Sequence, residues 1–251
     1  MSSPRLKFAV EAALEAGDAT LSLFQQQIEV HHKEDESPVT EADLLAERLI
    51  RKRLKSSFPE DGILGEEEGE SGSIDSRWLI DPIDGTKSFV SGVPLYATLL
   101  SYEVEGVPQI GVAYFPALKW LVYAEKGQGA FGDGKPIHVS QKATLERAMI
   151  AHAAITGMEK RGWLKGAQEL GKQCMGLRTW CDAYGHCLVA AGRVEAMIDP
   201  KVQPHDLSAV SLIVQEAGGI CSDVSGELWP RTEAISTNGL LHSKILETLR
   251  A

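Results

Sequence analysis

The segment that most constrains the fold is an apolar triplet, residues 78–80 (WLI), followed directly by residues 81–86 (DPIDGT). The triplet predicts a buried strand. Pro82 is expected to end the pairing of that strand, because proline has no N–H to donate. The chain then turns, so that Asp81 and Asp84 face the same place. The sequence therefore predicts a polar site at the end of a buried strand.

The residues after this turn predict a phosphate-binding site. Gly85 and Thr86 open a short helix through Phe89, and the unpaired N–H groups and positive dipole of a helix start attract phosphate. Two acids beside such a start can hold divalent cations that bridge protein and phosphate. The alternative is an ordinary Asp-rich turn. Five fixed residues of D-P-x-D-G-T arise by chance in a chain of this length on the order of once in 10⁴, which argues against it.

Further acids lie where they can join this site. Glu66 belongs to an acidic run that follows a short strand at 63–65. Such a run alone is usually a solvated face, but beside a metal motif one of its glutamates is expected as a ligand. Asp206 precedes an apolar helix. It either caps that helix or directs its carboxylate into the site.

The rest of the pattern divides the chain into two halves. Helical spacing predicts a helix over residues 6–24 and a second that opens at Thr40, with Leu45, Leu49 and Leu54 on one stripe. Strands are expected at 63–65, 78–80, 97–104, 109–114, 120–124, 148–151, 174–177, 195–198 and 220–222, and later helices at 184–191, 207–217 and 240–249. We expect an α+β half over residues 1–145, an α/β half over 146–251, and the active site between them.

Composition argues against several kinds of partner. The chain has 251 residues with 25 Lys+Arg and 35 Asp+Glu, a net charge of −10. It therefore has no excess of positive charge to neutralise the phosphates of a nucleic acid. Its most apolar stretch, residues 95–102, is far shorter than the ~20 residues of a membrane span. Residues 1–10 lack the apolar run of a signal peptide, and the four cysteines form no CxxC pair. We expect a cytoplasmic protein with no nucleic-acid or membrane partner.

Two motifs match known sites only in spacing. Residues 127–132 spell GxGxxG, but a dinucleotide fingerprint must open a helix, and here a strand-like segment follows. We interpret this motif as a glycine-rich turn, with a nucleotide site as the alternative. Cys187 and Arg193 have the spacing of a cysteine-dependent phosphatase loop, which needs exposed N–H groups and a thiol of lowered pKa. The apolar residues 188–191 indicate a core cysteine in a buried helix instead.

The acidic run at 65–67, the DPIDGT segment and the HDLSA segment at 205–209, in this order and spacing, resemble the inositol monophosphatase-like superfamily. The resemblance covers nearly the whole chain, from Lys33 to Gly219. It implies a layered α-β-α-β-α sandwich, a Mg²⁺-dependent and Li⁺-sensitive phosphatase, and a homodimer. Haloacid-dehalogenase phosphatases place two aspartates two apart, whereas Asp81 and Asp84 are three apart, a spacing that suits metal ligation.

The resemblance also implies a ligand set for two to three Mg²⁺ ions, with Mn²⁺ as a substitute. Glu66, Asp81 and the carbonyl of Ile83 would hold one ion, and Asp81, Asp84 and Asp206 a second. Glu66 and water would hold a weaker third. Without cations, such clustered carboxylates would repel one another and raise their pKa values. Oxygen-only ligation favours Mg²⁺ or Mn²⁺ over zinc.

The same resemblance assigns the attacking water and the phosphate. Asp43 and Thr86, with Glu66, would orient and help deprotonate the water, while the amides of Gly85 and Thr86 bind the phosphate. Asp43 has a second interpretation, since Thr40-x-x-Asp43 also fits a capping box. His205 stands where the family usually has tryptophan, a departure expected to alter packing around the acid that follows it.

Three features favour L-histidinol phosphate as the substrate. Thr86 is followed by Lys-Ser-Phe instead of the Thr-Asn-Phe of inositol monophosphatases, and residues 33–40 and 180–185 look like the histidinol-phosphatase branch. By the resemblance, Asp182 and Asp199 fall in the alcohol pocket together with Asp84. Carboxylates there would attract histidinol, which carries an ammonium and an imidazole that can protonate.

Alternatives remain open at this point. Asp182 also fits an N-cap of a helix starting at Ala183, and Asp199 matches a position that is acidic in inositol phosphatases too. Inositol 1-phosphate is the second candidate substrate, and a broad-specificity phosphatase the third. A cysteine-dependent phosphatase and a non-catalytic phosphate-binding module are the other classes considered.

Overall fold

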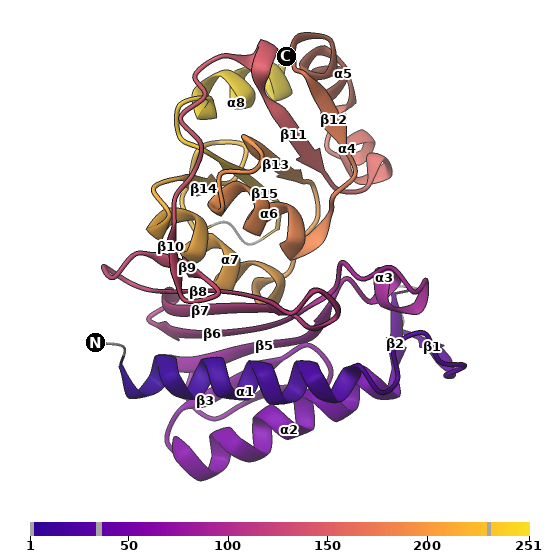
Figure 1. Cartoon of the computed structure of the whole chain (residues 1–251), viewed down its shortest axis with the longest axis vertical. Coiled ribbons are helices and arrows are strands. Elements are labelled where there is room, and N and C mark those ends of the chain that lie inside the picture. Colours follow the sequence, from indigo (N-terminus) through magenta and orange to yellow (C-terminus); the bar gives the residue numbers. More distant parts are fainter. Residues whose placement is uncertain (1–2, 34–36, 230–231) are drawn as a thin grey trace.

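The computed structural model describes residues 3–33, 37–229 and 232–251, which form five layers (Figure 1). Helices α1 (Pro4–Thr20) and α2 (Glu41–Ser57) cover an eight-stranded sheet. Helices α6 (Asp182–Ala190) and α7 (Pro204–Glu216) lie between that sheet and a five-stranded one. The far side of the second sheet carries three more helices, α4 (Ile155–Lys160), α5 (Leu164–Gln173) and α8 (His242–Arg250). The expected α-β-α-β-α sandwich is confirmed.

The first sheet has the order β10-β9-β8-β7-β6-β5-β3-β4. Its strands are β3 (Gly62–Gly65), β4 (Gly69–Ser71), β5 (Ser76–Asp84), β6 (Ala97–Val104), β7 (Val107–Phe115), β8 (Trp120–Glu125), β9 (Ala130–Gly132) and β10 (Lys135–Ile137). Among the described strands of this sheet, only β3 and β5 pair in parallel, with Gly65 opposite Ile80. The carboxyl ends of two parallel neighbours meet at one edge, so the acids that follow Gly65 and Ile80 are brought together.

The end of β5 corrects one prediction. Pro82 does not end the strand, because pairing with β6 resumes at Asp84 after a register shift. Proline has no N–H for the ladder, and the chain passes it as a bulge in which the Pro82 carbonyl accepts a hydrogen bond from the Thr98 hydroxyl at 2.9 Å. Gly85, with φ of +86°, then leads into α3 (Thr86–Val90). The short helix predicted after the two acids is confirmed.

The buried face of α2 corrects a second prediction. Leu45 is 40% exposed, and Leu49 is half-buried. The helix instead buries small and branched side chains together with an ion pair: Ala42, Ala46, Ile50, Leu54, Glu47 and Arg51. Alanines let the helix approach the sheet closely, since protein interiors are close-packed. Of the three predicted leucines only Leu54 belongs to the buried face, so the leucine spacing placed the stripe partly on a neighbouring face of the helix.

The second sheet has the order β12-β11-β13-β15-β14. Its strands are β11 (Met149–His152), β12 (Gly176–Arg178), β13 (Ala196–Asp199), β14 (Ile220–Ser222) and β15 (Ala234–Thr237). The sequence predicted all of these strands except β15, a short run that is buried along its whole length and so shows no alternation. It also missed α4 and the glycine-containing α5. No helix in the described ranges has the length and apolar character needed to cross a membrane.

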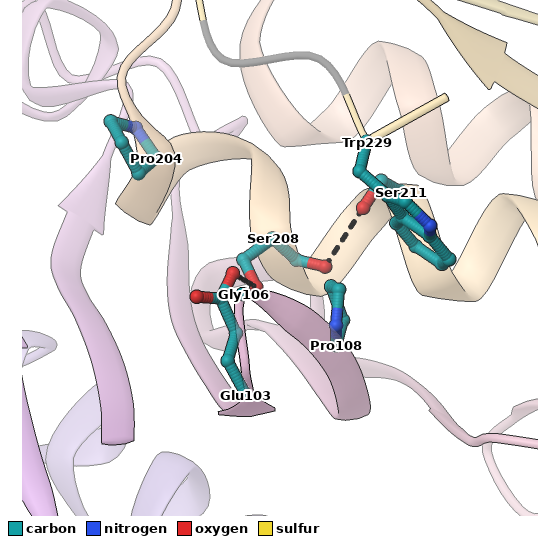
Figure 2. Close-up of a pocket in the computed structure, with 7 residues that line it drawn as sticks. All are labelled: Glu103, Gly106, Pro108, Pro204, Ser208, Ser211 and Trp229. Carbon is teal, nitrogen blue, oxygen red and sulfur yellow. Dashed lines mark hydrogen bonds between the residues drawn. The ribbon is translucent and has the colours of Figure 1, made fainter. Parts of the chain in front are cut away.

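A small cavity lies where α7 crosses the β6–β7 hairpin (Figure 2). Its volume is about 10 Å³, which is near the smallest space that holds one water molecule. The Ser208 hydroxyl donates to Glu103 Oε1 at 2.8 Å, and the Ser211 hydroxyl donates to the Ser208 carbonyl at 3.0 Å. The bond between Ser208 and Glu103 ties the first turns of α7 to β6, whereas the Ser211 bond stays within the helix. The link to β6 positions the acid in the first turn of α7.

Candidate active site

Four carboxylates from three elements converge at the edge where β3 and β5 end. Glu66 follows β3 and its amide donates to the Ile80 carbonyl at 3.1 Å. One oxygen from each of Asp81, Asp84 and Asp206 lies within 4.8 Å of the others. The structure thus brings together every acid that the sequence predicted as a metal ligand.

The electrostatics of this cluster fit a divalent cation. Asp81 is 2% exposed and Asp84 is 6% exposed. Burial, reinforced by neighbouring carboxylates, raises the pKa of both well above the usual range of an aspartate. Asp81 Oδ1 is buried without a hydrogen-bond partner among the described residues. Uncompensated buried charge is costly, and a hard cation bound by these oxygens would remove both the repulsion and the unsatisfied acceptor.

The first turn of α7 settles the open interpretation of Asp206. Its carboxylate Oδ2 accepts from the Gln203 amide at 2.8 Å, in a capping box whose N-cap is Gln203. Asp206 is therefore the third residue of the helix, and the same side chain also joins the acidic cluster. His205 Nε2 lies 3.2 Å from Asp206 Oδ1.

Asp43 and Thr86 meet beside the cluster, as expected. Thr86 Oγ1 lies 3.4 Å from Asp43 Oδ1 and 3.1 Å from the carbonyl oxygen of Ile83. The other oxygen of Asp43 accepts from the Thr40 amide at 2.8 Å and from the Thr40 hydroxyl at 2.6 Å. Burial raises the pKa of Asp43, against the opposing effect of its bonds to Thr40. The capping box is confirmed, and it leaves Oδ1 directed at Thr86.

Lys33 is tied to the acidic run. Its ammonium donates to Glu66 Oε1 at 2.8 Å and to Glu67 Oε1 at 2.7 Å. Burial raises the pKa of Glu67 to about 7, although its bond to Lys33 opposes the shift. Lys33 lies between β1 (Val30–His32) and β2 (Pro38–Thr40). Residues 34–36 of the predicted variant loop lie outside the described residues.

A cavity of about 670 Å³ extends from the carboxylates to α6 and the second sheet. Asp182 and Asp199 line it. Burial, reinforced by Asp182, raises the pKa of Asp199 to about 8. A β-carbon placed on Gly85 would lie 3.0 Å from Asp182 Oδ2, so this carboxylate faces the loop expected to bind phosphate.

The alternative role of Asp182 as an N-cap is wrong. Helix α6 begins at Asp182 itself, and its N-cap residue, Cys181, makes no side-chain cap bond. The Ala183 amide donates to Asp84 Oδ2 at 2.7 Å, which ties the start of α6 to the end of β5. Asp182 has φ of +59°, a left-handed conformation uncommon for a non-glycine residue. This φ distinguishes Asp182 from an ordinary N-cap, whose backbone is extended.

His186 also lines the cavity, which the sequence did not indicate beyond its i, i+4 spacing from Asp182. Its Nδ1 lies 2.7 Å from Ser236 Oγ. Burial lowers the pKa of His186 to about 4, so the imidazole is neutral at physiological pH.

The two motifs that resemble known sites only in spacing, Cys187 with Arg193 and the GxGxxG of residues 127–132, take no part in this site. Cys187 is completely buried in α6, and burial raises the pKa of its thiol, which opposes the thiolate that a cysteine phosphatase needs. Gly127 and Gly129 lie in the turn between β8 and β9 and donate their amides to the Glu216 carboxylate, each at 2.8 Å. The interpretations of a core cysteine and a glycine-rich turn are both confirmed.

Comparison with known proteins agrees with this geometry. The model of the inositol monophosphatase family matches residues 1–251. The chain is 43% identical to a histidinol-phosphatase from Chlorobaculum parvum, covering 95% of this chain and 92% of the relative. It is 38% identical to a histidinol-phosphatase from Mycobacterium tuberculosis, covering 100% of both. The solved structure of an IMPase from Thermotoga maritima has a TM-score of 0.91 at 31% identity, covering 99% of this chain and 97% of that one.

Proposed function

Since the chain belongs to the inositol monophosphatase family and is a phosphoric monoester hydrolase, we propose that its substrate is L-histidinol phosphate. The curated relatives named histidinol-phosphatase support this choice. Inositol 1-phosphate is the second candidate, because a solved IMPase shares the fold at 31% identity. A broad-specificity phosphatase is the third.

The observation that carries the substrate proposal is the position of Asp182. Its carboxylate is held beside Gly85 and within electrostatic reach of Asp84. Burial raises the pKa of Asp182, and the Asp206 carboxylate adds to the shift. A cationic alcohol would neutralise this carboxylate, whereas a neutral polyol offers only hydrogen bonds. The buried Asp199 on the same cavity adds a second carboxyl group that favours a ligand carrying an ammonium or imidazolium.

We further propose that the enzyme depends on Mg²⁺, with Mn²⁺ as a substitute. Glu66, Asp81 and the Ile83 carbonyl would hold one ion, Asp81, Asp84 and Asp206 a second, and Glu66 with water a third. When bound, the cations polarise the phosphoryl oxygens, lower the pKa of water and neutralise the leaving alkoxide. The buried, mutually repelling carboxylates support this assignment.

The chain's own residues then have distinct tasks. Asp43 Oδ1 and the Thr86 hydroxyl would orient the attacking water and take up its proton, an assignment supported by their 3.4 Å separation. The amides of Gly85 and Thr86 would bind the phosphate at the start of α3. Attack by water leaves no phosphoenzyme. The remaining family-based proposals are inhibition by Li⁺, a homodimer, a cytoplasmic location and two halves that meet near residue 145 with the site between them.

The substrate proposal is tested by phosphate release from L-histidinol phosphate and inositol 1-phosphate, in wild type and in Asp182→Asn. A partly exposed charged hydrogen bond is worth roughly 0.5–3 kcal/mol, and ~1.4 kcal/mol is tenfold. We expect Asp182→Asn to lower kcat/KM for histidinol phosphate by a few-fold to about a hundredfold and to leave inositol 1-phosphate nearly unchanged.

The comparison between the two substrates controls for folding, because a folding defect lowers both rates together. A wild-type enzyme that hydrolyses inositol 1-phosphate far better than histidinol phosphate would overturn the substrate proposal in favour of the second candidate.

A further inference from the structure

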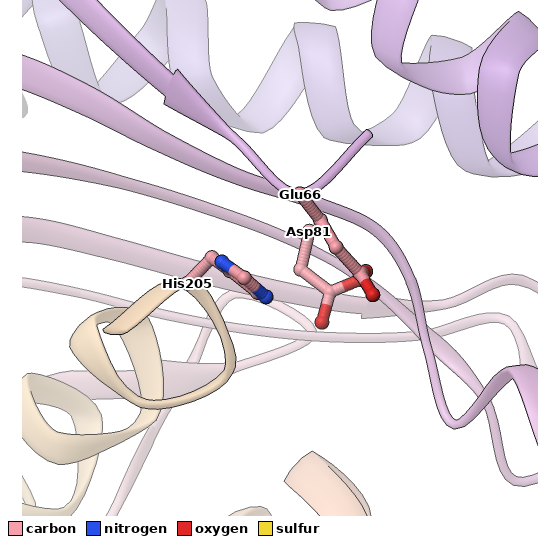
Figure 3. A group of neighbouring side chains, drawn as sticks. All are labelled: Glu66, Asp81 and His205. Atoms are coloured by element: carbon pink, nitrogen blue, oxygen red, sulfur yellow. The ribbon is translucent and has the colours of Figure 1, made fainter. Parts of the chain in front are cut away.

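His205 stands beside the carboxylates, at a position where the family resemblance leads us to expect tryptophan. A ring nitrogen of His205 and one oxygen each of Glu66 and Asp81 lie within 4.8 Å of one another. Figure 3 shows the tip of the imidazole and the two carboxylates pointing toward one another. The three side chains come from the first turn of α7, the turn after β3 and strand β5. Their meeting is therefore a product of the tertiary fold, which a spacing pattern does not reveal.

An unsatisfied oxygen in this group points to a missing ligand. Asp81 is 2% exposed, and its Oδ1 has no hydrogen-bond partner within the described residues. An acidic cluster by itself is common without an ion, but a buried carboxylate oxygen with no donor costs free energy. A cation among the three donors would supply what this oxygen lacks.

We propose that His205 is a nitrogen ligand of the ion held by Glu66 and Asp81, and that this site consequently prefers Mn²⁺ over Mg²⁺. The inference rests on the proposed metal-dependent function and goes beyond it by distinguishing two sites. Mg²⁺ favours oxygen ligands and keeps its waters. An imidazole nitrogen is a softer donor that suits transition ions better, and Mn²⁺, although it also takes carboxylates, accepts such a nitrogen more readily than Mg²⁺ does. The group formed by Asp81, Asp84 and Asp206 offers only oxygens, so that site should discriminate less between the two ions.

A positioning role is the competing explanation for the same contact. His205 Nε2 lies 3.2 Å from Asp206 Oδ1, so its N–H can donate to that carboxylate and orient it. In that role His205 would support Mg²⁺ and Mn²⁺ alike, because only the geometry of Asp206 would depend on it. The two roles therefore differ in metal selectivity.

Two substitutions separate the roles. His205→Gln keeps an N–H that can donate to Asp206 and replaces the nitrogen ligand by an amide oxygen, while His205→Phe removes both. Each metal is titrated alone into chelator-treated protein, with Mn²⁺ followed by electron paramagnetic resonance and Mg²⁺ by calorimetry. We expect the ratio of Mn²⁺ to Mg²⁺ affinity to fall by about tenfold or more in both variants, because the nitrogen donor that distinguishes the two ions is gone and even outer-shell partners of a metal contribute ~10–100-fold to affinity. Equal weakening of both ions in His205→Phe, with wild-type affinities in His205→Gln, would overturn the proposal.

A spectroscopic readout reports the bond directly. Electron spin-echo modulation of the Mn²⁺-loaded wild type should show coupling to ¹⁴N, which changes when the protein is labelled with ¹⁵N-histidine and is absent from both variants. Absence of histidine nitrogen coupling in the wild type would contradict the ligand role. All these measurements omit substrate, so they decide the role of His205 even if the protein fails to hydrolyse histidinol phosphate. Melting temperatures confirm that the variants fold.

Discussion

Asp84→Asn is expected to lower kcat by about a thousandfold while leaving the protein folded. Asp84 is one of three carboxylates whose oxygens lie within 4.8 Å of one another, and the substitution removes a charge that holds the proposed cation. Metal ions stabilise transition-state charge by several kcal/mol, and ~4 kcal/mol corresponds to about a thousandfold in rate. Steady-state phosphate release at saturating Mg²⁺ measures the loss.

The same substitution should not destabilise the metal-free protein. Asparagine still offers an oxygen to the Ala183 amide, which donates to Asp84 at 2.7 Å. The substitution also removes one of several mutually repelling buried carboxylates, so the melting temperature without metal should stay equal or rise. Asp75→Asn, at an exposed position before β5, is the matched control for loss of one charge. An Asp84→Asn enzyme within threefold of the wild-type kcat would contradict the ligand role.

Thr86→Val is expected to lower kcat by about 10²–10³-fold with little change in metal affinity. The substitution keeps the shape of the side chain and removes the hydroxyl that lies 3.4 Å from Asp43 Oδ1. General acid–base catalysis typically contributes 10²–10⁴-fold, and the proposed water would lose one of its two orienting groups. Rapid-quench or steady-state phosphate release measures kcat, and calorimetry measures Mg²⁺ binding.

Thr86→Ser is the matched control, because it retains the hydroxyl and should keep most of the activity. Loss of activity in both variants would show that the threonine methyl group is required as well as the hydroxyl. Wild-type activity in Thr86→Val would rule out a role for this hydroxyl in positioning water.

The parts predicted well from sequence are those fixed locally. Residues 78–80 and 85–86 carry the signals of a strand and of a helix start, so the core of β5 and α3 followed from the chain order, whereas the bulge at Pro82 did not. The capping box at Thr40 likewise depends on residues three apart. The DPIDGT segment predicted its paired aspartates without any resemblance. Glu66 and Asp206 were only candidates until the family resemblance placed them in the cluster, since nothing local brings α7 to the edge of β5.

The parts predicted poorly depend on packing between distant elements. The core-facing side of α2 was misplaced because alanines and not Leu45 approach the sheet. The role of Asp182 as an N-cap was wrong because α6 already begins at Asp182, whose carboxylate faces Gly85 from another layer. His205 was expected to affect only packing, yet its ring nitrogen lies within 4.8 Å of two carboxylate oxygens. Each error concerns a contact between segments far apart in the chain.

The measurement that tests the central claim most directly is phosphate release from L-histidinol phosphate by chelator-treated protein, before and after Mg²⁺ is added. The proposed function predicts no turnover in chelator and full recovery with Mg²⁺, because the carboxylates of Asp81, Asp84 and Asp206 need a cation to act on the phosphate. Iodoacetamide, added as a comparison, should have no effect, since the Cys187 thiol is buried and burial raises the pKa of the Cys181 thiol on the cavity, which disfavours the reactive thiolate. Full activity in chelator would contradict the metal-dependent account.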